Sequence, residues 1–134
     1  MGESDIDQYE FVNLIATVYN QTDYDMELLS YSLEWGKWEE QPGPIVSKES
    51  GKVKAQGRSC AVSGTQGEVV WRIRDSRFLH GAPKITFTFD QPYCGENKYS
   101  CISNDLSYEG TITIVSGKDK HKTIMNVHIK PRIE

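Results

Sequence analysis

The sequence predicts an all-β protein, a single antiparallel β-sandwich of roughly seven to nine short strands. Three observations predict this fold class. Apolar and polar residues alternate in most segments, which is the two-residue period of a strand. Clusters of Gly, Pro, Asn, Asp and Ser interrupt these segments about every dozen residues, as turns do in a sandwich. No segment has the apolar spacing of an amphipathic helix, so two packed sheets fit the pattern best.

Length and charge narrow the class of protein further. At 134 residues the chain has the length of one domain, which we place over residues 1–134. The net charge is −4 and the basic residues are scattered singly, so the basic surface of a nucleic-acid-binding protein is missing. The longest apolar runs are shorter than the roughly 20 residues of a spanning helix. The acidic start, Met1 to Gln8, lacks the regions of a secretory signal, so we expect a protein made in soluble form and released non-classically.

The first predicted strand covers Phe11 to Tyr19, with one apolar face formed by Val12, Leu14, Ala16 and Val18. A turn at residues 20–23 leads to a second predicted strand. In that strand the residues expected to face the core are Leu29, Tyr31, Leu33 and Trp35, because they alternate with polar residues. The short connection predicts that the two strands pair as an antiparallel hairpin.

The rest of the chain alternates between turns and further strands. Pro42 and Pro44 place a turn or loop at residues 41–44. The segment 57–67 holds three glycines, which suit tight turns and close backbone approach. Strands are predicted at 52–55, 68–73, 85–89, 111–115 and 123–129, and turns at 75–77, 80–83, 90–92 and 116–119.

Three stretches resemble the aegerolysin family. Residues 33–38, Leu-Glu-Trp-Gly-Lys-Trp, are similar to a strand-ending Trp-Gly-Lys, and residues 57–67 are similar to a Gly-Arg-Ser-Asp-Ala-x-x-Gly-Thr-x-Gly loop. Residues 89–99 look like a third family stretch. This last stretch, with residues 64–73, is most similar to the small component of the Bacillus binary insecticidal crystal toxins, a bacterial branch of the family.

The resemblance implies a sandwich that binds a membrane lipid, typically a sphingolipid, and recruits a larger pore-forming protein of the membrane attack complex/perforin or crystal-toxin type. It implies a non-enzymatic toxin component that acts in cytolysis or haemolysis at target-cell membranes, with insecticidal activity and homo-oligomers as extensions. Two family positions differ: Asn13 stands where fungal members have a tryptophan, and Ser63 where they have an acidic residue. Sphingomyelin with cholesterol is therefore not implied.

Aromatic side chains supply the first candidate lipid contacts. Trp35, Trp38 and Tyr93 suit a bilayer interface, since each ring carries a polar tip. Trp35 matches a tryptophan that the family uses for lipid contact, but its place on the face of Leu33 fits a core residue equally well. Trp38 stands among charged residues and is predicted to be the exposed tryptophan. Trp71 shares a face with Val69 and Ile73 and is predicted to be core.

Polar and cationic residues complete the candidate site. The Arg58 guanidinium could pair with a lipid phosphate, although a structural salt bridge is the more common role. Lys98 and Tyr99, with Tyr93, could present cationic and aromatic groups to a head group; an ordinary solvated loop fits nearly as well.

No cofactor or metal is predicted. The histidines are far apart, and the cysteines Cys60, Cys94 and Cys101 have no zinc spacing. Cys94 and Cys101 could pair in an oxidising environment, but free thiols are favoured.

No enzyme motif is present, so we predict no catalytic activity. The alternatives that remain are a carbohydrate-binding lectin-like module, a small hydrolase built from Asp90, Glu109 and His121, and an inert structural domain.

Overall fold

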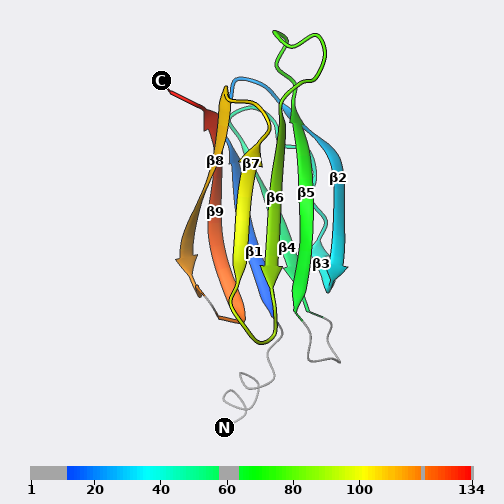
Figure 1. Cartoon of the computed structure of the whole chain (residues 1–134), viewed down its shortest axis with the longest axis vertical. Coiled ribbons are helices and arrows are strands. Elements are labelled where there is room, and N and C mark those ends of the chain that lie inside the picture. Colours follow the sequence, from blue (N-terminus) through cyan, green and yellow to red (C-terminus); the bar gives the residue numbers. More distant parts are fainter. Residues whose placement is uncertain (1–11, 58–63, 119, 134) are drawn as a thin grey trace.

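The computed structural model describes residues 12–57, 64–118 and 120–133. These residues form nine strands and no helix (Figure 1). The strands are β1 (Asn13–Asn20), β2 (Met26–Trp35), β3 (Lys37–Glu40), β4 (Ser50–Gln56), β5 (Thr65–Ile73), β6 (Lys84–Gln91), β7 (Lys98–Ser103), β8 (Tyr108–Ser116) and β9 (Lys122–Pro131). The predicted all-β sandwich is confirmed.

Two sheets pack face to face. One has five strands in the order β3-β4-β1-β9-β8, and the other has four in the order β2-β5-β6-β7. Described neighbours pair antiparallel except β1 and β9, which are parallel. In Figure 1 the four-stranded sheet lies in front, and the turn after β6 is at the lower end of the molecule.

The predicted hairpin between the first two strands is wrong, because β1 and β2 belong to different sheets. The second strand also departs from simple alternation. It is an edge strand with register shifts between Leu28 and Ser30 and between Leu33 and Trp35. Each shift adds a residue that reverses the faces of those that follow. As a result Leu29 and Trp35 are exposed. Tyr31 stands opposite the buried Val69 on the core side, but at this sheet edge it is still 38% exposed, so of the four residues expected inside only Leu33 packs against the core.

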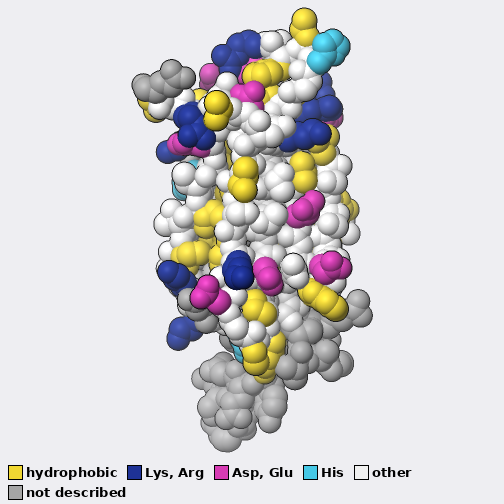
Figure 2. Space-filling view, in the orientation of Figure 1, with side chains coloured by type: hydrophobic (Ala, Val, Ile, Leu, Met, Phe, Trp, Pro, Cys, Tyr) yellow, Lys and Arg dark blue, Asp and Glu magenta, His cyan; other side chains and the backbone are white. Residues whose placement is uncertain are grey.

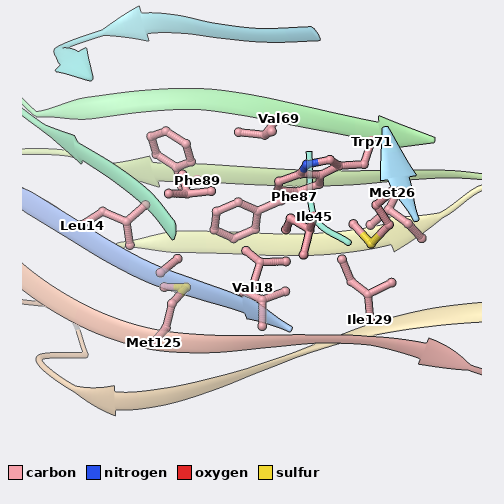
Figure 3. Close-up of a cluster of buried hydrophobic side chains, with 14 of the residues drawn as sticks. Leu14, Val18, Met26, Ile45, Val69, Trp71, Phe87, Phe89, Met125 and Ile129 are labelled. Carbon is pink, nitrogen blue, oxygen red and sulfur yellow. The ribbon is translucent and has the colours of Figure 1, made fainter. Parts of the chain in front are cut away.

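The core lies between the sheets and is built from alternate residues of both (Figure 3). The predicted apolar face of β1 is confirmed, since Val12, Leu14, Ala16 and Val18 are fully buried. Trp71 is also buried as predicted, and its Nε1 donates a hydrogen bond to the Gly43 carbonyl at 2.9 Å. That bond satisfies the one polar atom of the indole.

Predicted strand positions 52–55, 68–73, 85–89, 111–115 and 123–129 all fall within strands. The predicted turn at 90–92 is wrong for Asp90 and Gln91, which continue β6. Two strands, β3 and β7, were not predicted, because both are short and rich in polar residues. Phe11, Arg58, Cys60 and Ser63 lie outside the described residues.

Two described cysteines are free thiols with different surroundings. Cys94 is exposed in the loop after β6, and Cys101 is partly buried on β7. Burial raises the pKa of the Cys101 thiol to about 12. Because the thiolate is the reactive form, Cys101 should react slowly with thiol reagents.

In a Cys60→Ser background we expect one fast-reacting thiol at pH 8, Cys94, and a second that reacts only after denaturation. A chromogenic disulfide reagent counts the two phases, and Cys94→Ser should remove the fast one. Two fast thiols in the folded protein would contradict the burial of Cys101.

Candidate functional site

The site begins at the lower end of the sandwich, where β2, β5 and β6 meet. The chain leaves β2 at Trp35 and crosses to the other sheet at Gly36, which has a φ of +96°. A side chain at Gly36 would lie 2.5 Å from the Gln56 carbonyl, so glycine is required for the crossing. The Thr65 hydroxyl donates to the Trp35 carbonyl at 3.2 Å. The backbone below the indole is therefore held while the ring, 61% exposed, faces outward.

Trp35 borders a cavity of about 300 Å³. Tyr93, in the loop after β6, also lines this cavity, so two of the predicted residues are brought together. The remaining lining residues are Gly64, Thr65, Gln66, Asp90, Gln91 and Pro92. An exposed indole and a phenol beside an open cavity form a surface that can take up a partly apolar ligand.

Tyr93 is held in place by His121, which precedes β9. The two ring centroids are 4.4 Å apart, and His121 Nε2 donates to the Tyr93 carbonyl at 2.6 Å. A carbonyl can only accept, so Nε2 carries the proton. The rim of the cavity is thus tied to the five-stranded sheet.

Gln91 supports the cavity from within the sandwich. Its side chain is fully buried, and Nε2 donates to the carbonyls of Asn13 and His121, each at 2.7 Å. Oε1 accepts a hydrogen bond from the Tyr99 hydroxyl at 2.8 Å. One amide therefore joins β6 to β7, β1 and the loop before β9.

A second concavity, of about 520 Å³, continues from the first along the outer face of the four-stranded sheet. The two share Gln66 and Asp90. Lys98 and Tyr99 both border it, so these predicted residues lie close to the Trp35 cavity. The Tyr99 ring packs against the core and its hydroxyl donates a hydrogen bond to Gln91, so its predicted role as an exposed aromatic contact is wrong. Lys98 is exposed and stands in register opposite Asp90.

The structure reverses the expectation for the two N-terminal tryptophans. Trp38, predicted to be exposed, is half-buried, because β3 turns its ring inward onto the core. It makes edge contacts with Tyr31 and Phe89 at ring-centroid distances of 5.7 and 6.0 Å. Trp35 is the exposed tryptophan because the shift after Leu33 turns it outward.

The hydrolase alternative fails on geometry. His121 precedes β9, whereas Glu109 pairs with Lys130 near the other end of that strand. Asp90 lies in the other sheet. Within the described part of the chain, no three His, Cys, Asp or Glu side chains form a group that could hold a metal ion.

Sequence reasoning missed Gln66, Gln91 and Pro92 as part of the site. Gln91 had a detectable signal, since alternation from Phe87 and Phe89 places it on the inward face of β6. A glutamine on an otherwise apolar face indicates a buried hydrogen-bonded role. Gln66 and Pro92 gave no such signal, because only tertiary packing brings them beside Trp35.

The aegerolysin family model matches residues 10–130. The chain belongs to the aegerolysin family. No curated protein sequence is similar enough to count as a match. Three solved structures show the same aegerolysin fold at low sequence identity, so the likeness concerns the fold alone.

The first of these structures is RahU protein in complex with a TRIS molecule, with 18% identity and a TM-score of 0.67 over 94% of this chain and 98% of that one. The second is the lipid-binding protein Nakanori, with 10% identity and a TM-score of 0.75 over 96% and 76%. The third is IP-1A from Alcaligenes faecalis, with 17% identity and a TM-score of 0.65 over 90% and 91%.

Proposed function

We propose that this aegerolysin binds a membrane lipid of the sphingolipid type through the lower end of the sandwich. The observation that carries the proposal is the exposed Trp35 beside Tyr93 on the rim of an open cavity. Indole and phenol rings partition to the interface between head groups and acyl chains. Membership of the family and the fold shared with a lipid-binding protein support the same function.

Docking from outside the bilayer fits this geometry. Trp35 ends β2 and Tyr93 lies in the turn after β6, and the turn after β6 is at the lower end of the elongated molecule (Figure 1). Both rings can therefore enter the interface while most of the two sheets stays in water. The described residues contain no helix that is long and apolar enough to cross a membrane. The site needs no reaction step, and binding alone is its role in this proposal.

We further propose that the chain is one component of a two-component pore-forming toxin with insecticidal activity. The support is the resemblance of residues 33–38 and 57–67 to the family's motifs. A larger protein of the membrane attack complex/perforin or crystal-toxin type would form the pore. The chain alone is then expected to bind vesicles loaded with a fluorescent dye and release little of the dye until such a partner is added.

Replacing Trp35 by Ala should weaken vesicle binding about ten- to a hundredfold, since the mutant lacks the indole that would enter the bilayer interface. The measurement is co-sedimentation with phosphatidylcholine vesicles that contain sphingomyelin, ceramide phosphoethanolamine or a glycosylceramide. Leu79→Ala is the matched control, because Leu79 is 88% exposed and lies at the other end of the sandwich. Its binding should be unchanged.

Thermal unfolding of both variants should match that of the unmodified protein, since neither side chain is buried. Absence of pelleting with every sphingolipid, or equal loss in both variants, would remove the proposed function. The fold and family would stand in either case.

A further inference from the structure

We infer that the groove on the outer face of the four-stranded sheet receives the sugar head group of a glycosylated sphingolipid. The groove is defined by Ser32, Glu34, Gln66, Glu68, Thr88, Asp90, Lys98 and Ser100. This inference rests on the proposed function and names the class of lipid. It concerns a surface beside the Trp35 cavity that the proposal above leaves unused.

Strand register builds the groove. One row of outward residues, Trp35, Gln66, Asp90 and Lys98, crosses the sheet near its lower end. A second row, Ser32, Glu68, Thr88 and Ser100, lies two residues away along β5, β6 and β7 and three along the bulged β2, at a distance of about 7 Å. The row between them has its side chains on the core side, so backbone forms the floor.

Gly67 belongs to that middle row, and its lack of a side chain on the core side lets β2 pack closely against β5. A side chain there would lie 2.4 Å from the Ser32 carbonyl and 2.8 Å from Leu33 Cδ2. The volume, about 520 Å³, is typical of pockets that hold small ligands.

The charges in the groove favour a ligand that carries hydroxyl groups over one that carries a phosphate. Three carboxylates, Glu34, Glu68 and Asp90, line the groove together with one cation, Lys98. Figure 2 shows acidic and basic side chains close together on the lower half of this face. An anionic phosphate would be repelled by the excess of negative charge, whereas sugar hydroxyls donate hydrogen bonds that a carboxylate strengthens.

These carboxylates contrast with those at the other end of the sandwich. There Glu27 pairs with Arg72 and Arg74, and Glu109 with Lys130 and Arg132. In the described chain no ion pair within 4.0 Å involves Glu34, Glu68 or Asp90. Their acceptor positions therefore remain open to a ligand.

Hydroxyl groups complete the chemistry. Thr88 Oγ1 and Ser100 Oγ are hydrogen-bonded to each other and keep further capacity, since a hydroxyl has one proton and two lone pairs. The groove joins the Trp35 cavity through Gln66 and Asp90. A lipid with its ceramide end at Trp35 would thus place its sugar along the sheet.

The test compares phosphatidylcholine vesicles that contain lactosylceramide, ceramide or sphingomyelin, using co-sedimentation. We expect at least tenfold tighter binding to lactosylceramide than to either of the others. Glu68→Gln should weaken that binding about tenfold, because a neutral amide accepts the sugar's hydrogen bonds less strongly. Glu49→Gln, at an exposed carboxylate far from the groove, should have no effect.

Each other outcome identifies which proposal fails. Equal or tighter binding to sphingomyelin that is insensitive to Glu68→Gln would overturn the sugar site and leave the proposed function standing. Binding to none of the sphingolipids would overturn both. Lactosylceramide binding that survives Glu68→Gln and Thr88→Val together would place the sugar outside the groove and overturn the inference.

Discussion

Replacing Asp75 by Asn is expected to lower the free energy of unfolding by about 2–4 kcal/mol at pH 7, because it disrupts a buried charged hydrogen-bond network. The Asp75 side chain is fully buried. It accepts hydrogen bonds from Arg77 Nη2 at 2.6 Å and from the Tyr108 hydroxyl at 2.7 Å. Tyr108 is itself buried, so an amide at position 75 leaves donors facing each other in the interior.

The effect should depend on pH with a definite sign. Hydrogen bonds from the Arg77 guanidinium hold the pKa of the Asp75 carboxyl well below its usual range, against the opposing effect of burial. A lowered folded-state pKa adds stability above the unfolded-state pKa, about 4, and that stability is lost as the pH falls toward the folded-state value. The difference in the free energy of unfolding between the unmodified protein and Asp75→Asn should therefore shrink below about pH 4.

Urea unfolding followed by tryptophan fluorescence at pH 7 and pH 3 measures this difference in the free energy of unfolding. Asp23→Asn is the control, since the Asp23 side chain is 80% exposed and its pair with Lys48 lies at the surface. It should change stability by less than about 0.5 kcal/mol. A gap of equal size at both pH values would show that the charge of Asp75 is not responsible.

Gln91→Leu is expected to destabilise the protein by a similar amount, about 2–4 kcal/mol, since three hydrogen bonds of a buried amide are lost at once. Leucine has nearly the same volume, so the cost comes from polar groups left without the amide rather than from a cavity. The destabilisation should be largest near the substituted residue. We expect the lower end, with Tyr93 and His121, to open more readily than the core.

Amide hydrogen exchange distinguishes a local loss of stability at the lower end from a loss of stability of the whole domain. The Asn13 amide donates to the His121 carbonyl, which also accepts from Gln91, so its exchange should accelerate more than that of core amides such as Val127. Gln56→Leu, on a half-buried strand residue, serves as the control. Uniform acceleration in Gln91→Leu would contradict a specific role at this end.

Several parts of this molecule follow from the sequence by itself. The fold class, the fully buried face of β1 and the core position of Trp71 all follow from alternation, because a strand with one buried face must repeat its apolar residues every second position. Local motifs also indicated the family, through residues 33–38 and 57–67. These features depend on neighbours along the chain, which the sequence displays directly.

Only the tertiary structure decided which tryptophan faces solvent. The extra residue in β2 reverses the face of Trp35, and packing of β3 on Phe89 turns Trp38 inward. A register shift depends on the partner strand β5, which lies about 30 residues further along the chain. The same reason applies to Gln91 and the groove carboxylates: their roles arise from strands brought together by the sheets, so no local pattern contains them.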